Sequence, residues 1–417
     1  MDNPYALAAA LAQNGAYEKA WKVAGSLLNE NPNDPLALVT ASYVMLHTGS
    51  LPQAYHFAKA AVEINPQDDN AWTNFGHAAS RMCLVDEAEK YYRRGLQCVK
   101  SAANRNALWV NLAALYVDQG DFDRAESFSR RLLDADPGNV SALSNIGFCQ
   151  LSKRDWANGW KNYHNTIGSP WRKRVNYKNE PEWDGSPGKT VVVYADQGIG
   201  DEISFASMIP DAAKRCKKLI LDCDGRLENL FRRSFPDVRV YGTGVKDEKW
   251  AKEDRDIEAS LPLGQLGEFV RTNDNDFPGT PYLVPCPIRT SMWRKQFSGR
   301  PTIGIAWTGG VPHTNGRNRK VSLTDLLPIL SLDAHFVSLQ YKSAAAEIAT
   351  FKLNRDHKVD LVEYPWATLT DDYDDTAALV AACDYVLCIQ TAVARTAGAL
   401  GVPTTVLLPT TSNWFYG

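Results

Sequence analysis

A glycine loop followed by acidic residues is the first segment of this sequence whose residue types and spacing suit chemistry. The apolar run from Val191 leads into Asp-Gln-Gly-Ile-Gly-Asp-Glu at residues 196–202, which predicts a strand, a turn and a helix start. Gly198 and Gly200 let the backbone approach a ligand closely, and the N–H groups of a helix start favour anions. The spacing is not that of the GxGxxG dinucleotide motif. Asp201 is either a helix cap or a catalytic base, and spacing alone favours the cap.

A cationic loop follows a second apolar run. The run ends at Trp307, Gly309 supplies a turn, and Arg317, Arg319 and Lys320 come close together in the polar stretch after it. Arginine offers a two-pronged hydrogen-bonding fork and lysine a point charge, so this loop suits a pyrophosphate. A solvated loop is the equal alternative.

A third polar segment opens a helix of small residues. Gln390 and Thr391 come directly after the apolar run Tyr385–Ile389, and Ala392 and Arg395 belong to the helix that begins there. Amide and hydroxyl groups at such a position can bond to phosphate or ribose. An ordinary helix cap is the slightly favoured alternative.

Composition excludes several classes of protein. The net charge of −3 provides no overall attraction to nucleic acid or anionic membrane. The seven histidines do not cluster with cysteines or carboxylates at ligand spacing, so we expect no metal. The eight cysteines form no CxxC pair, which favours buried free thiols in a reducing compartment. The start of the chain does not look like a signal peptide, and no run is long enough to span a membrane, so we expect a cytoplasmic protein.

The N-terminal part of the chain, which precedes these loops, has a repeated sequence pattern. Gly15, Ala20 and Pro32 are answered by the same residue types 34 residues later, and Trp109–Pro137 follows the same order. This period and these small residues are typical of tetratricopeptide repeats, which are helix hairpins stacked into a solenoid. We expect about five hairpins over residues 1–167, the last one a cap. The concave face would hold a peptide, a protein or glycan acceptor, or a second copy of the chain in a homo-oligomer.

From Thr190 onward, apolar β-branched runs alternate with helix-like stretches such as Glu202–Arg215. This rhythm predicts parallel sheets covered on both faces. The predicted strands are Val191–Ala195, Leu219–Cys223, Val238–Tyr241, Thr302–Trp307, Phe336–Gln340, Val359–Val362, Tyr385–Ile389 and Thr404–Leu408.

Domain boundaries follow from breaks in this rhythm. Residues 168–189 form a linker with a basic run, Trp171–Arg174, for which solvation is favoured over an anion or nucleic-acid contact. A Pro- and Asn-rich stretch divides the remainder into two Rossmann-like units, 190–285 and 286–417. The predicted fold is therefore an α-solenoid followed by an α/β region with two facing doubly wound sheets.

Taken together in order, these segments resemble bacterial tetratricopeptide-repeat proteins fused to a GT-B glycosyltransferase domain. Such domains are related to heptosyltransferases and, more distantly, to O-GlcNAc transferase. The segments that carry the resemblance are Gly159-Trp160 with Tyr163, Trp183-Asp184-Gly185, Gln197–Ile203 with Phe205-Ala206, Pro281-Tyr282-Leu283, Gly304–Trp307, Val337–Gln340, Asp375–Ala378, Thr391–Ala394 and Ala397–Gly401.

The resemblance implies metal-independent transfer of a sugar from a nucleotide-sugar donor to a hydroxyl acceptor. The C-terminal unit would bind the donor, and Asp201 would be the base that deprotonates the acceptor. The other residues implied to contact or frame the donor are Gly198, Gly200, Trp307, Gly309, Arg317, Arg319, Lys320, Gln340, Gln390, Thr391, Ala392 and Arg395.

Two alternatives remain open at this stage. Gln390 and Arg395 stand where the family has Asp and His, Gly316 stands where Asp is usual, and the chain stops where relatives continue. A binding scaffold with an inactive or truncated transferase domain is therefore the second hypothesis. Glycosylation of modified nucleic acid is the third, and the near-neutral charge weighs against it.

Overall fold

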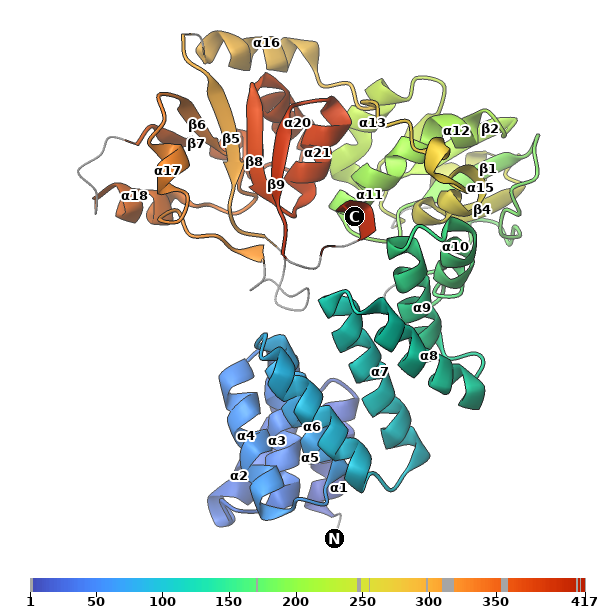
Figure 1. Cartoon of the computed structure of the whole chain (residues 1–417). Coiled ribbons are helices and arrows are strands. Elements are labelled where there is room, and N and C mark those ends of the chain that lie inside the picture. The colour runs from blue at the N-terminus through green and yellow to red at the C-terminus, as the bar shows by residue number, and fades with distance from the viewer. Residues whose placement is uncertain are drawn as a thin grey trace. The chain divides into compact units, whose positions relative to one another are not determined.

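The computed structural model describes residues 3–169, 172–245, 249–254, 256–297, 299–309, 319–353, 359–409, 412 and 414–416. Contacts between residues divide the chain into two compact units. One is built mainly from the chain up to Cys149, and the other from Gln150 to Pro409 without residues 311–318. Each unit is described by itself (Figure 1).

The first unit is a series of antiparallel helix hairpins. Asp34 and Asp68, one repeat apart, cap two of its helices by accepting hydrogen bonds from backbone N–H groups in the first turn. Gly49 ends a helix in the left-handed conformation at a φ of 85°. The helices are α1 (Pro4–Gln13), α2 (Tyr17–Glu30), α3 (Pro35–Thr48), α4 (Leu51–Ile64), α5 (Asp69–Arg81), α6 (Val85–Cys98), α7 (Ala102–Gln119), α8 (Phe122–Ala135) and α9 (Val140–Ser152).

Small residues set the distance between these helices. Ala20, Ala54, Ala88 and Ala125, at equivalent positions of successive repeats, are fully buried. Packing of each hairpin on the next then buries the apolar faces that a single hairpin would leave exposed. The predicted N-terminal helical repeat is confirmed.

The second unit begins with a helix that the sequence assigns to the solenoid. α10 (Trp156–His164) packs against α15 (Gly267–Val270), and the indole of Trp160 donates to the carbonyl of Arg271 at 2.9 Å. The side-chain hydrogen bonds of His164 with Glu182 and Glu268 raise its pKa to about 9. These contacts explain why the division by contacts falls after Cys149, where the repeat pattern alone extends the solenoid to residue 167.

A parallel sheet of the order β3-β2-β1-β4 follows in the described residues. β1 is buried along its whole length, which explains its continuous run of apolar residues. The fourth strand was not predicted, because Ala-Ser-Leu-Pro carries no strand pattern. The strands are β1 (Thr190–Tyr194), β2 (Lys218–Asp222), β3 (Arg239–Tyr241) and β4 (Ala259–Pro262), and the further helices are α11 (Ile199–Phe205), α12 (Ile209–Ala213), α13 (Glu228–Ser234) and α14 (Lys249–Glu253).

The sequence also predicts one helix over Glu202–Arg215, and this prediction is wrong. The chain forms α11, a short 3-10 turn and then α12. Pro210 lies in the first turn of α12, where its missing N–H costs nothing, whereas the interior of a longer helix would lose a hydrogen bond there.

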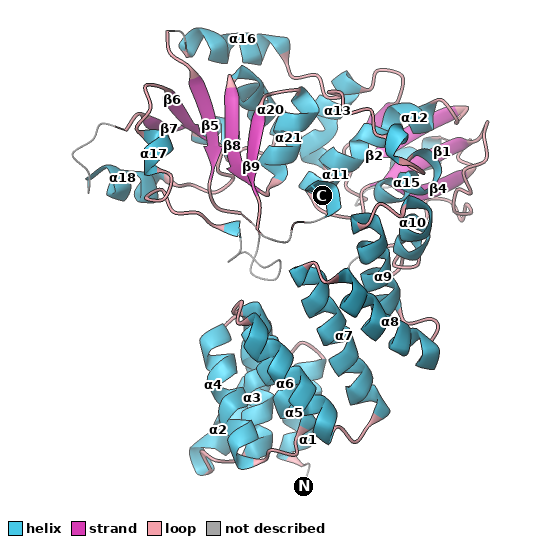
Figure 2. Cartoon of the chain, in the orientation of Figure 1, coloured by secondary structure: helices cyan, strands magenta, loops and turns pink. Residues whose placement is uncertain are grey.

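The second sheet is also parallel, in the order β7-β6-β5-β8-β9 for the described residues (Figure 2). Its core holds apolar residues from β5, β6 and the helices on one face. The strands are β5 (Thr302–Ala306), β6 (His335–Ser338), β7 (Leu361–Glu363), β8 (Tyr385–Ile389) and β9 (Thr404–Leu407), with helices α16 (Pro287–Gln296), α17 (Leu327–Leu330), α18 (Ala345–Leu353), α19 (Pro365–Thr368), α20 (Tyr373–Ala382) and α21 (Ala392–Leu400). The predicted region of parallel sheets and helices is confirmed.

One tyrosine bonds to helices of both sheets. The hydroxyl of Tyr282 donates to the carbonyl of Ile203 in α11 at 2.8 Å, and its backbone N–H donates to the carbonyl of Ala399 in α21 at 2.9 Å. A second tie joins Arg233 of α13 to Asp374 of α20. These bonds hold α11 and α13 of the first sheet against α20 and α21 of the second.

Close packing in the first unit predicts opposite effects for two glycines. A β-carbon on Gly76 would lie 2.5 Å from the ring of Tyr92, whereas one on Gly25 would meet nothing nearer than 3.9 Å. Alanine gains about 1 kcal/mol over glycine in a helix, and overpacking costs about 1–3 kcal/mol. We therefore expect Gly25→Ala to slow amide exchange in α2 and Gly76→Ala to speed it in α5 and α6, measured by hydrogen-exchange mass spectrometry. Slower exchange in α5 of the Gly76 variant would contradict this packing.

Candidate functional site

The predicted donor-binding residues gather where the strand order of the second sheet reverses. The chain proceeds outward from β5 to β7 and then returns to place β8 on the other side of β5. The carboxyl ends of strands at such a switch point are where open α/β sheets bind ligands. Here Gly309, after β5, lies directly against the side chain of Thr391, after β8.

The cationic segment returns to the same end of β5. The backbone N–H of Gly309 donates to the carbonyl of Arg319 at 3.0 Å, and Lys320 pairs with Thr308 as an antiparallel bridge. The side chain of Lys320 is exposed. Two of the three predicted cations therefore start from backbone that adjoins the switch point, and Arg317 lies outside the described residues.

Two residues predicted to contact the donor, Gln340 and Trp307, have buried side chains that contact other parts of the protein. Gln340 is buried, and its side-chain oxygen accepts from the backbone N–H groups of Trp307 at 3.1 Å and Thr308 at 3.3 Å. Its amide nitrogen donates to the hydroxyl of Thr308. The Trp307 indole is fully buried in the core of the second sheet. Both side chains shape the end of β5, and the hydroxyl of Thr308, which sequence reasoning missed, takes part.

The start of α21 carries unused hydrogen-bonding capacity. Thr391 occupies the N-cap position, yet its side chain makes no capping bond, and its hydroxyl is buried without a partner. The first N–H groups of a helix have no partner within the helix and favour negative charge. The slightly favoured interpretation of this segment, an ordinary side-chain cap, is therefore wrong for Thr391. Gln390 beside it is buried.

The glycine loop of the first sheet meets this helix. A β-carbon on Gly200 would lie 3.3 Å from the Cα of Ala392, so α11 and α21 approach closely here and a larger residue would press on the backbone of α21. Across the contact, the Asp201 carboxylate accepts from the guanidinium of Arg395 at 2.5 Å. The N-cap of α11 is Gly198, so Asp201 is not its cap, and the spacing-based preference for that role is wrong.

A buried acid follows Asp201 in the same helix. The Glu202 side chain is buried and accepts from the backbone N–H of Asp224 at 2.9 Å. Burial raises the pKa of Glu202 to about 8, although the bond from Asp224 opposes this. The two adjacent acids of the motif therefore differ in environment, since the Asp201 side chain is 30% exposed and paired with an arginine.

Arg172, in the linker, contacts the first residue of the glycine loop. Arg172 and Asp196 form an ion pair at 2.7 Å in which each side chain is 2% exposed. The prediction that the basic run is solvated is therefore wrong for Arg172. Sequence reasoning passed over Asp196, although a charged residue directly after a buried strand is a signal that could have drawn attention to it.

The part of the chain that the structure describes holds neither a cluster of metal ligands nor a membrane-spanning helix. No group of three or more His, Cys, Asp or Glu side chains there could hold a metal ion. No helix there has the length and apolar character needed to cross a bilayer.

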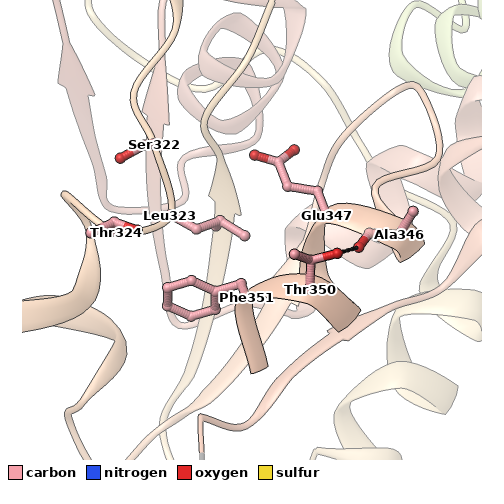
Figure 3. Close-up of a pocket in the computed structure, with 7 residues that line it drawn as sticks. All are labelled: Ser322, Leu323, Thr324, Ala346, Glu347, Thr350 and Phe351. Atoms are coloured by element: carbon pink, nitrogen blue, oxygen red, sulfur yellow. Dashed lines mark hydrogen bonds between the residues drawn. The ribbon is translucent and has the colours of Figure 1, made fainter. Parts of the chain in front are cut away.

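A cavity of about 520 Å³ lies elsewhere in the second unit (Figure 3). The hydroxyl of Thr350 is bonded to the carbonyl of Ala346 within α18, at 2.8 Å. None of the residues predicted for the donor lines this cavity, so it is separate from the switch-point site. Its lining residues are Ser322, Leu323, Thr324, Ala346, Glu347, Thr350 and Phe351.

Known proteins match this chain in two ways, through one helical repeat and through a relative aligned over most of its length. Residues 107–139 match the tetratricopeptide repeat family. The chain is similar to Protein FlbA of Caulobacter vibrioides, with 26% identity over 397 residues, covering 87% of this chain and 63% of that protein. The chain thus spans about 63% of the length of this relative.

Solved structures of helical-repeat proteins resemble the chain over part of its length. PilW, a type IV pilus biogenesis factor, is 18% identical with a TM-score of 0.36, covering 39% of this chain and 74% of its own. PilF of Pseudomonas aeruginosa is 14% identical with a TM-score of 0.37, covering 42% and 77%. A tetratricopeptide-repeat protein of Thermus thermophilus is 20% identical with a TM-score of 0.35, covering 39% and 88%.

The buried acid predicts a pH dependence of stability. With the pKa of Glu202 raised to about 8, the folded chain keeps a proton that the unfolded chain releases above about pH 4.5, so this residue lowers stability as pH rises between those values. We expect Glu202→Gln to be more stable than wild type by about 1–3 kcal/mol at pH 8.5, with little difference near pH 4. Thermal unfolding followed across this range measures the effect.

The control is Glu258→Gln, because Glu258 also accepts from a backbone N–H, that of Thr190 at 2.7 Å, but is exposed. Its variant should follow the wild-type profile. A Glu202 variant with that same profile would show that Glu202 is ionised in the folded chain.

Proposed function

We propose that the second unit is a GT-B glycosyltransferase domain that moves a sugar from a nucleotide-sugar donor to a hydroxyl acceptor without a metal. One observation carries the proposal. The carboxyl end of β1 and the switch point of the second sheet are brought together, so that Asp201 lies against the first turns of α21. The resemblance assigns the base to the first of these places and the diphosphate to the second.

The chemistry of the second place suits a diphosphate. Uncapped N–H groups at the start of α21, the unpartnered hydroxyl of Thr391 and the backbone that carries Arg319 and Lys320 lie around one strand end. Fixed N–H dipoles and cations stabilise the charge that develops on a leaving diphosphate, which is the work a metal does in other transferases. Arg395, which pairs with Asp201, adds a cation beside them.

The first unit would supply the acceptor. The tetratricopeptide repeat and the stacked hairpins support a protein-interaction arm. In the proposed function this arm recruits a protein or glycan acceptor, and the inverting or retaining course of the transfer stays open.

The base is tested with Asp201→Asn. Loss of a general base lowers turnover by about 100- to 10,000-fold and leaves donor binding in place. The full chain is incubated with mixed nucleotide sugars and co-expressed partner proteins, and intact-mass analysis follows the transfer. The matched control is Asp333→Asn, because the Asp333 side chain is 90% exposed. Turnover unchanged in the Asp201 variant would remove this residue from the mechanism.

The donor site is tested with Thr391→Val, which removes the unpartnered hydroxyl and keeps the shape of the side chain. Because that hydroxyl bonds to nothing in the protein, stability should not fall. Donor affinity should weaken about 5- to 10-fold, since one hydrogen bond to a phosphate contributes about 1 kcal/mol or more. Calorimetry with a panel of nucleotide sugars measures the change.

Thr290→Val is the control, because Thr290 of α16 also has a buried hydroxyl without a partner. Its variant should bind donors as wild type does. Equal affinity of both variants would place the donor elsewhere, and binding of no donor by the wild-type chain would favour the scaffold hypothesis.

A further inference from the structure

We propose that Arg172 and Tyr163 are positioning residues that hold the glycine loop so that Asp201 stays in place for the reaction. The inference rests on the proposed function and adds to it a support drawn from α10 and the linker. Tyr163 belongs to α10, and Arg172 follows it in the chain. Both reach the loop at residues that precede its glycines.

Arg172 fixes the first residue of the loop. Its Nε donates to the carboxylate of Asp196 at 2.7 Å. Its Nη1 donates to the carbonyl of Tyr163 at 2.9 Å and to the hydroxyl of Thr166 at 3.1 Å. One guanidinium therefore joins the end of β1 to α10 and the turn that follows this helix. The guanidinium makes these bonds from two nitrogens held in one plane, whereas a lysine ammonium would have to reach all three acceptors from one nitrogen.

Tyr163 fixes the next residue. Its hydroxyl accepts a hydrogen bond from the side-chain amide of Gln197, and its ring lies under the Arg172 guanidinium, with 4.0 Å from the ring centre to the central carbon. Burial raises the pKa of Tyr163 to about 12, and the carboxylates of Asp196 and Asp201 add to the rise, while Arg172 opposes it.

The segment needs such support because Gly198 lies at the entry to α11 and Gly200 lies in the first turn of this helix, just before Asp201. Glycine loses more conformational freedom on ordering than any other residue. Displacement of a catalytic group by about 1 Å can lower the rate about 100-fold. Bonds to Asp196 and Gln197 restrain the backbone just before the first glycine, so the restraint acts at the start of the segment that leads to Asp201.

The buried ion pair of Arg172 and Asp196 is not explained by its contribution to the free energy of unfolding. A buried ion pair often stabilises no more than apolar side chains of the same size. Here the second terminal nitrogen of Arg172 is buried without any hydrogen-bond partner, which adds a cost. A role in holding the loop accounts for a charged pair at this place.

Two sets of variants test the proposal in the full chain. Tyr163→Phe removes the hydroxyl and keeps the ring beneath Arg172. The double variant Arg172→Met with Asp196→Leu replaces the ion pair by apolar side chains, so that no unpaired charge is left to unfold the chain. Tyr177→Phe is the control, because Tyr177 is a buried tyrosine whose hydroxyl donates to the side chain of Asp222 in β2 at 2.8 Å rather than bonding to a residue of the loop.

Two measurements are made on each variant. Hydrogen exchange of peptides covering residues 197–201 should be about 10-fold faster in the Tyr163 and double variants and unchanged in the control. The kcat for sugar transfer should fall about 10-fold or more in the double variant, with the KM for the donor unchanged, because only the base is displaced. A merely structural pair would leave the kcat per folded molecule as it is, so kcat is referred to the folded fraction measured by circular dichroism.

The outcomes separate this proposal from the proposed function. Loop exchange equal to that of the Tyr177 control overturns the positioning role, even if the wild-type chain transfers sugar. Faster exchange with unchanged kcat also overturns it. The third outcome is faster loop exchange in the Tyr163 and double variants, together with a wild-type chain that binds no nucleotide sugar. It would mean that the loop is held as described and that the proposed function fails.

Discussion

The candidate site depends on the close approach of α11 and α21. Gly200 and Ala392 bring the backbones of these helices together, because a side chain on Gly200 would meet Ala392. This approach places the Asp201 carboxylate within hydrogen-bonding distance of Arg395. Without it, the end of β1 and the switch point of the second sheet would be two unrelated surfaces. Both sheets are parallel, and their close approach brings polar residues from the two sets of strand ends together.

Some of the polar groups around this contact are hydrogen-bonded within the protein, and others are unbonded or partly exposed. Gln340, Asp196 and Glu202 are buried and bonded to backbone or side-chain groups of the loops. The hydroxyl of Thr391 is buried and bonded to nothing, and the Asp201 side chain remains partly exposed. Buried polar groups are normally satisfied, so an exception beside a helix start is a reason to look for a ligand there.

The sequence predicted the helical repeat and eight of the strands, because a 34-residue period and continuous apolar runs come directly from burial. It did not predict β4, whose four residues have no pattern, or the break at Pro210. It brought out Asp201, Thr391 and Arg395 as residues of interest, but the pairing of Asp201 with Arg395 joins residues 194 positions apart and depends on tertiary packing. The burial of Arg172 with Asp196 also depends on tertiary packing, and the sequence therefore predicts a solvated charge there.

Tyr282 bonds to helices of both sheets close to Asp201 and Arg395. It bonds to Ile203 and Ala399, which lie two residues after Asp201 and four after Arg395 in their helices. The Arg233–Asp374 pair also joins the two sheets, so a swing of one sheet against the other would turn about both places. Points near a fulcrum travel least, so Asp201 and Arg395 would stay almost still while distant loops sweep through a wide arc. A wide movement of the outer loops and a nearly constant distance between Asp201 and Arg395 are then compatible in one motion.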